Sequence, residues 1–196
     1  MLPYRQVHLD FHTSECVPGI GSKFDKEQFQ NALKTGHVNS ITIFAKCHHG
    51  WSYYPTKVNA MHPNLNFDLL GAQLEACKEI NVKSPVYLSA GFDERMAREH
   101  GDWLIRHPDE SLSDTKDFTT PGYHRMCYNT PYLDKLLAEI DEVMVLYHPG
   151  GIFLDISAVT PCVCGKCRKD IVSRGKDYRD PDAVWEQAEI TFANYV

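Results

Sequence analysis

Short apolar segments alternate with longer amphipathic segments four times along this chain, and that alternation is the strongest constraint on its fold. The apolar segments, each suited to a β-strand, cover residues 5–12, 38–45, 86–88 and 152–155. Parallel strands need a helical crossover between them, so the pattern predicts an α/β fold with a parallel sheet and right-handed connections. Because a complete (β/α)8 barrel of the TIM type needs about 250 residues, the chain fits a partial barrel of the first four to five βα units.

A small, open, doubly wound sheet is the alternative fold. Such sheets bind dinucleotides through a glycine-rich turn after the first strand. The chain has Gly19 and Gly21 there, but no third glycine opens a helix. This favours the partial barrel, and without any linker or low-complexity segment we expect residues 1–196 to form one domain, the N-terminal half of a catalytic barrel.

Capping residues mark where the helices begin. Asp25 and Gln28 form a capping box, with Phe24 and Phe29 as the hydrophobic staple, and Gly36 ends that helix. Further helix starts are expected at Asp68, Thr130–Pro131 and Asp180–Pro181, with a short helix over residues 96–104.

The composition restricts the class of protein. Hydrophobic residues make up 43% of the chain, which suffices for a core, and the formal net charge of −6 argues against nucleic acid or an anionic membrane as the main partner. No apolar run approaches the length of a membrane span, and the N-terminus lacks a signal-peptide core. The seven cysteines are an odd number, so a reduced, cytoplasmic protein is expected.

Polar side chains follow each predicted strand. In a parallel barrel the carboxyl ends of the strands meet at one face, where ligands bind. The side chains expected there are His8, Asp10, His12, Lys46, His48, His49, Glu94 and Asp155. Asp155 directly follows the apolar run Ile152–Leu154, and a carboxylate there is costly to desolvate unless it is paired.

Three segments resemble α-L-fucosidases. The run FAKCHHGW, residues 44–51, resembles their A-K-H-H-D-G-F motif, with Cys47 in place of its first histidine and His49 in place of its aspartate. His12, with Ser14 and Pro18 after it, resembles their F-x-H-W-G-x-x-S-x-P segment, and IFLDI resembles their strand-four motif. As a whole the chain resembles the second fucosidase group, the hypothetical glycosyl hydrolase 6 group or family 151, related to family 29.

The resemblance implies a retaining glycoside hydrolase of α-L-fucosidase type, with Asp155 as the nucleophile. It also implies His12 and His48 as sugar-binding residues. The other substrate-binding residues expected from the strand ends and the following loop are His8, Asp10, Lys46, His49 and Trp51. Glu94 or Asp93 is a candidate acid/base; otherwise that group lies outside the chain, and the chain alone is then inactive. The expected partner is a carbohydrate substrate, without a cofactor. Open sheet edges would favour a homo-oligomer.

Three other interpretations remain open. His8, Asp10 and His12 could bind a metal, as in metal-dependent hydrolases of the amidohydrolase or phosphoesterase type. A non-catalytic carbohydrate-binding protein would keep Trp51 and the histidines without needing Asp155. The third interpretation is a structural zinc site formed by cysteines.

Cys162, Cys164 and Cys167 lie close enough in sequence to hold zinc, with a fourth ligand from Cys127, Cys77 or His148. Otherwise these three are reduced thiols that pack a loop.

Overall fold

The computed structural model describes residues 4–115 and 119–195. The chain divides into two compact units. The first unit consists of Met1–Ser89 and Ala138–Asp155, and the second of Ala90–Leu137 and Ile156–Val196. Each unit is described by itself below.

The first unit contains a four-stranded parallel sheet with the strands in sequence order, β1-β2-β3-β4. This order confirms the predicted half-barrel. The strands are β1 (Gln6–His8), β2 (Ser40–Lys46), β3 (Val86–Ser89) and β4 (Ile152–Asp155).

The first strand is shorter than the predicted span of residues 5–12. Its ladder to β2 ends at the pair His8 and Thr42. Beyond that point the backbone is held by a side chain instead, since the Tyr53 hydroxyl donates to the carbonyl of Phe11 at 2.8 Å. Leu9 is 62% exposed, so the predicted strand alternation does not continue past His8.

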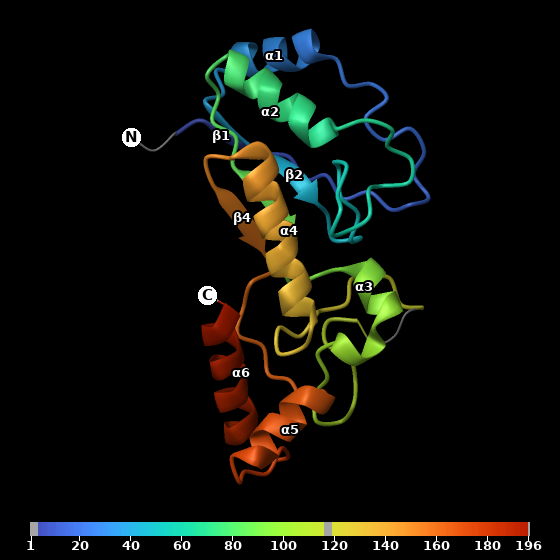
Figure 1. The fold of residues 1–196 in the computed structure, drawn as a ribbon, viewed down its shortest axis with the longest axis vertical. Helices are drawn as coiled ribbons and strands as arrows, with labels where there is room; N and C mark the ends of the chain where they lie inside the picture. The colour runs from blue at the N-terminus through green and yellow to red at the C-terminus, as the bar shows by residue number, and fades with distance from the viewer. Residues whose placement is uncertain (1–3, 116–118, 196) are drawn as a thin grey trace. The chain divides into compact units, whose positions relative to one another are not determined.

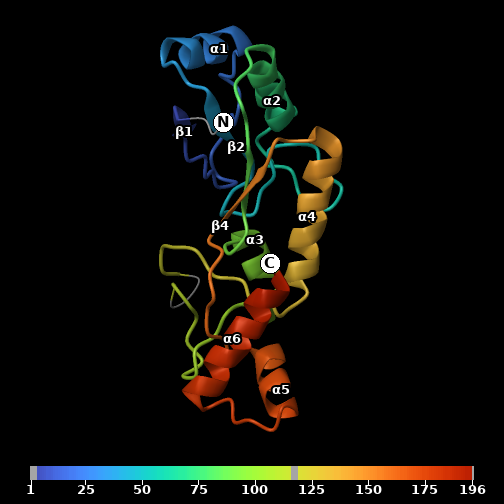
Figure 2. The same ribbon diagram turned by 90° about the vertical axis from the view of Figure 1, so that its left-hand side faces the viewer.

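Three helices pack on one face of this sheet: α1 (Lys26–Thr35), α2 (Leu69–Glu79) and α4 (Tyr132–Tyr147). Side chains of the strands alternate, so every second one joins the core beneath these helices. In both views α1 and α2 lie side by side (Figures 1 and 2). This core contains Leu33, Ile41, Ile43, Ala45, Leu70, Cys77, Val86, Leu88 and Val143.

An aromatic row covers the opposite face of the strands. Phe44, Tyr87 and Phe153 are in register across β2, β3 and β4. The rings of Phe44 and Tyr87 stack with centroids 3.9 Å apart, and those of Tyr87 and Phe153 with centroids 5.8 Å apart. The candidate site lies on this face.

A register shift in β2 changes the face that Lys46 occupies. Phe44 pairs with Tyr87, but Lys46 pairs with Leu88, so one extra residue is accommodated between them. Lys46 therefore lies on the side of the helices, where its ammonium is 2.7 Å from the Glu139 carboxylate of α4. Both side chains are only 1% exposed.

The caps of the first unit confirm the predicted helix boundaries. The Asp25 carboxylate accepts from the Gln28 N–H at 2.7 Å, the rings of Phe24 and Phe29 lie 5.7 Å apart, and Gly36 caps the end of α1. Asp68 caps α2 by accepting from the Gly71 N–H at 2.8 Å.

The second unit is built from helices of different lengths and irregular segments. Its elements are α3 (Glu94–Glu99), the 3-10 turn η1 (Gly101–Trp103), α5 (Gly165–Ser173) and α6 (Pro181–Tyr195). The first two replace the single helix expected over residues 96–104, because the chain leaves the helical conformation at His100, where φ is −134° and ψ is 67°. The helix α5 was not predicted; Cys164 at its start offers no side-chain cap. Figure 2 shows α5 beside α6.

No helix of the described residues combines the length and apolar character needed to cross a bilayer.

We expect Lys46→Met to destabilise the protein by about 3–5 kcal/mol, because it removes the ammonium from a buried carboxylate. Urea denaturation at neutral pH measures the free energy of unfolding. The matched control is Lys26→Met, which removes one partner of the exposed pair between Lys26 and Glu79 and should change stability far less, because water screens that pair. Equal losses in the two variants would contradict the importance of the buried pair.

Candidate active site

Asp155 ends β4 and extends its carboxylate over the aromatic face of the sheet. The Tyr87 hydroxyl of β3 donates to its Oδ2 atom at 2.7 Å. The register accounts for this contact, since Asp155 pairs with Ser89, and Tyr87 lies two residues before Ser89 on the same face. The Asp155 side chain remains 33% exposed, so a ligand could reach it.

His48 lies beside this carboxylate. Its Nδ1 is 2.7 Å from the Ser89 hydroxyl, and its Nε2 is 3.8 Å from Asp155 Oδ2. His12, from the segment after β1, stacks on His48 with ring centroids 3.9 Å apart. His12 Nδ1 also accepts the backbone N–H of His48 at 3.2 Å, which fixes the two imidazoles against each other.

Asp10 extends the group toward β1. Its Oδ1 lies 3.2 Å from His8 Nε2 and 3.7 Å from His12 Nε2. The His8 ring contacts the aromatic row, with its centroid 5.7 Å from that of Tyr87. We call the following six residues of the first unit the imidazole–carboxylate cluster: His8, Asp10, His12, His48, Tyr87 and Asp155.

Burial sets the charge states in this cluster. Burial and, after it, the neighbouring His12 lower the pKa of His48 to about 4, against the raising effect of Asp155 and Asp10. Burial likewise lowers the pKa of His12. Burial and the hydrogen bond to Asp155 raise the pKa of Tyr87, so its hydroxyl stays a proton donor. Near neutral pH, then, uncharged imidazoles stand beside a carboxylate, an arrangement suited to hydrogen-bonding hydroxyl groups.

Two predicted sugar-binding residues lie elsewhere. The Lys46 ammonium is buried against Glu139 because of the register shift, away from the cluster. Trp51 is half-buried, and its indole N–H donates to Glu15 at 3.2 Å. His49 is half-buried next to His48, close enough for its charge to lower the pKa of His48.

Glu94 and Asp93 belong to the second unit and have structural contacts there. Asp93 is the N-cap of α3 and accepts from the Met96 N–H at 2.9 Å. The buried Glu94 carboxylate accepts the backbone N–H of His124 at 2.7 Å and lies 2.6 Å from His124 Nδ1. These contacts hold the carboxylate of Glu94 inside its own unit.

Tyr87 and Ser89 were not predicted as site residues. Their signal was present, because V-Y-L-S alternates and places both side chains on one face of a buried strand. Uncharged polar side chains such as tyrosine and serine, on the face of a strand next to a carboxylate, are therefore candidate site residues in the same way as charged ones.

Metal-ligand geometry is found at the cysteines. Among the described residues, the donor atoms that converge as a metal site requires belong to Cys127, Cys162, Cys164 and Cys167, and not to His8, Asp10 and His12. Three residues were candidates for the fourth ligand, and the structure places Cys127 with the other three cysteines. Cys77 is part of the core of the first unit, and His148 is exposed.

We expect His48 to be uncharged at pH 6 and to titrate near pH 4. Between pH 6.5 and about 4 the unfolded chain would bind a proton at His48 that the folded chain does not, so this residue should lower stability as pH falls through that window. NMR titration of histidine-labelled protein, assigned with His48→Gln, measures the midpoint. A midpoint above about 6 would contradict the burial of this ring.

The comparisons with known proteins agree on one family. A family model described as hypothetical glycosyl hydrolase 6 matches residues 25–156. The structure of α-L-fucosidase isoenzyme 2 from Paenibacillus thiaminolyticus is 49% identical over 99% of this chain, with a TM-score of 0.97. The chain spans 29% of the length of that fucosidase chain. No curated protein sequence matches the chain.

Two more distant structures show the fold alone. A hypothetical protein from Ruminiclostridium thermocellum is 12% identical, with a TM-score of 0.61, and the match covers 90% of this chain and 87% of that one. An α-fucosidase from Thermotoga maritima, in complex with a mechanism-based inhibitor, is 20% identical with a TM-score of 0.50, covering 86% and 34%. The matched family model and the 49% identical fucosidase confirm the resemblance found in the sequence, and the chain belongs to the hypothetical glycosyl hydrolase 6 family.

Proposed function

We propose that this chain is part of a retaining glycoside hydrolase of α-L-fucosidase type in which Asp155 is the nucleophile. The observation that carries the proposal is the position of Asp155, at the carboxyl end of β4 with Tyr87 donating to it and His48 beside it. The 49% identity to an α-L-fucosidase supports the substrate class.

The proposed chemistry proceeds in two steps. An Asp155 oxygen attacks the anomeric carbon as the bond to the leaving oxygen breaks, and an acid protonates that oxygen. The residue that acted as the acid then removes a proton from water. The water oxygen attacks the anomeric carbon, displaces Asp155 and releases the sugar with retained configuration. Asp155 suits the first role because a strand end holds it in place while its carboxylate stays partly exposed.

The uncharged imidazoles would bind sugar hydroxyls. Neutral imidazole has one donor and one acceptor nitrogen, which matches a hydroxyl group. In the proposed complex His12 and His48 contact the sugar directly, and the exposed Asp10 accepts from a further hydroxyl. His8, His49 and the half-buried Trp51 would border the sugar, whereas Lys46 would act only through the fold.

We place the acid/base outside this chain. Glu94 is buried and held by His124, so it is a poor candidate for donating to a leaving group. Since the chain spans 29% of the fucosidase relative, the full-length enzyme would supply this second carboxyl group, about 5 Å from the nucleophile. Residues 1–196 alone would then be inactive.

We also propose that the protein forms a homo-oligomer and is cytoplasmic. The terminal strands of the sheet are β1 and β4, and Phe153 of β4 is 43% exposed, which supports association with further strands or a second copy. The seven free cysteines support the proposed cytoplasmic location.

Replacement of Asp155 tests the nucleophile. In the full-length protein, assayed on a panel of nitrophenyl glycosides that includes the α-L-fucoside, Asp155→Asn should lower kcat by roughly a thousand-fold or more. Asp141→Asn, the same change at an exposed position of α4, should retain activity. With Asp155→Gly, added azide should restore turnover and give a glycosyl azide of inverted configuration.

Full activity of Asp155→Asn would refute the assignment. Sugar binding by a wild-type protein that hydrolyses none of the glycosides would favour a non-catalytic carbohydrate-binding protein instead.

Tyr87 should act as a positioning residue for Asp155. Tyr87→Phe removes the hydroxyl that donates at 2.7 Å, so we expect kcat to fall by about ten-fold with little change in KM. Tyr147→Phe is the matched control, because the Tyr147 hydroxyl donates to Asp68 at 2.9 Å, at the cap of α2. Equal kcat values for the two variants would show that the Tyr87 hydroxyl has only a structural role.

A further inference from the structure

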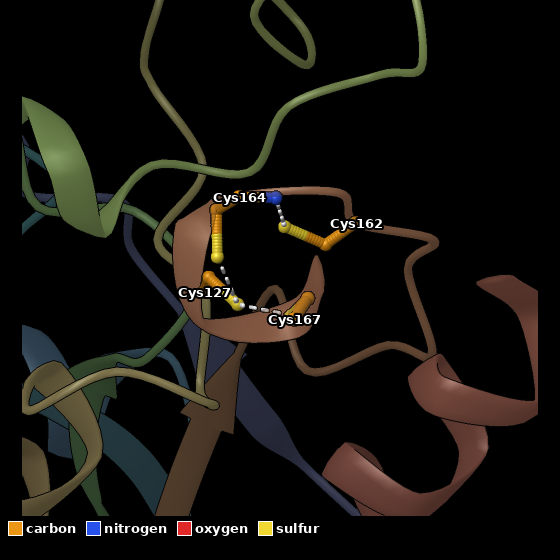
Figure 3. A group of neighbouring side chains, drawn as sticks. All are labelled: Cys127, Cys162, Cys164 and Cys167. Carbon is orange, nitrogen blue, oxygen red and sulfur yellow. Dashed lines mark hydrogen bonds between the residues drawn. The ribbon is translucent and has the colours of Figure 1, made fainter. Parts of the chain in front are cut away.

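Four cysteines of the second unit converge on one point. Cys127 precedes α4, Cys162 and Cys164 lie in the segment that leads to α5, and Cys167 is in the first turn of α5. Their donor atoms all lie within 4.8 Å of one another, and all four residues are buried. Figure 3 shows the four sulfur atoms turned toward a common centre.

We propose that these four cysteines bind one structural zinc ion. A tetrahedral site with Zn–S bonds of 2.3 Å places its sulfur atoms about 3.8 Å apart. The observed Sγ–Sγ distances are 3.6 Å between Cys127 and Cys167 and 3.9 Å between Cys127 and Cys164. The proposal rests on this geometry and is independent of the function proposed above.

The distances disfavour the other uses of a cysteine cluster. A disulfide requires sulfur atoms about 2.05 Å apart, and all seven cysteines are free. A four-iron cluster binds each cysteine to a different iron, which spreads the sulfur atoms much farther apart than a single ion does. Tetrahedral coordination of one ion by four cysteine sulfurs is the usual arrangement of a structural zinc site.

Hydrogen-bond donors point at the sulfur atoms. The Cys164 N–H donates to Cys162 Sγ, with 3.3 Å between nitrogen and sulfur, and the Asn129 amide donates to Cys167 Sγ at 3.5 Å. Asn129 is oriented by a second bond, to Asp170 at 2.8 Å. The N-terminus of α5, which begins after Cys164, adds the positive end of a helix dipole. Four thiolates around one Zn²⁺ carry a net negative charge, so each of these donors would stabilise the loaded site.

The site would hold together segments that lack regular structure. Backbone bonds tie the cysteine segments to the end of η1 and to the loop after it: Cys127 N–H donates to Trp103 O, and Val163 N–H donates to Arg106 O, both at 2.8 Å. The apolar cluster here contains Ile105 and the cysteines themselves. A second apolar cluster contains Val163, Ile171, Ala183 and Val184. The metal bonds would add folding energy to these clusters, and four protein ligands leave no open position for catalysis.

Metal analysis of the purified protein tests the proposal directly. After purification without chelators, inductively coupled plasma mass spectrometry should find about one zinc per chain. Cys127→Ser and Cys164→Ser should each lose most of it. Cys77→Ser, which removes a buried thiol from the core of the first unit, should retain it.

Measurements on the wild-type protein keep the test independent of whether variants fold. Titration of the thiols with a mercurial reagent should release zinc in proportion to the cysteines that react. A strong chelator should lower the Tm of the protein. Replacement of zinc by cobalt should produce the visible bands of tetrahedral thiolate coordination. Three results would each overturn the assignment. They are protein without zinc in which all seven thiols react, a disulfide among the four cysteines, and bound iron.

Discussion

The register of β2, β3 and β4 decides which side chains meet on each face of the sheet. Because Phe44, Tyr87 and Phe153 pair across three strands, the Tyr87 hydroxyl reaches the carboxylate at the end of β4. One extra residue in β2 then sends Lys46 to the helix side, and the following residues bring His48 to the aromatic side. A slip of one residue in any of these pairs would exchange the faces and separate His48 from Asp155.

Burial gives this cluster its chemistry. His12 and His48 stack in a desolvated position, so their pKa values fall and neither ring neutralises Asp155 near pH 7. The carboxylate therefore depends on donated hydrogen bonds, of which the Tyr87 bond is one. A carboxylate that is held by hydrogen bonds and partly exposed retains its nucleophilic oxygen, which is the property the proposed reaction needs.

Local signals predicted most of the first unit. The strands, the cap at Asp25 and the strand-end position of Asp155 follow from short-range patterns, and all are present. The contacts that were missed depend on residues distant in sequence. Nothing in the run F-A-K indicates the register shift that removes Lys46 from the predicted site, and its partner Glu139 lies on a helix far along the chain.

The second unit was harder to predict for a related reason. Its segments have weak periodicity, and the start of α5 is marked only by Cys164, a residue with no capping signal. Three cysteines are close in sequence, but Cys127 joins them only through the fold. The two units thus differ in what holds them: an apolar core with a buried ion pair in the first, and small apolar clusters together with the proposed zinc site in the second.

The proposed reaction requires that Asp155 forms the covalent bond to the sugar. The most direct measurement is to treat the full-length protein with a fluorinated fucosyl fluoride, which slows release of the glycosyl-enzyme, and to map the label by peptide mass spectrometry. We expect one adduct, a fluorinated fucosyl group on Asp155. An adduct on another carboxylate, or NMR evidence that hydrolysis inverts the anomeric configuration, would contradict it.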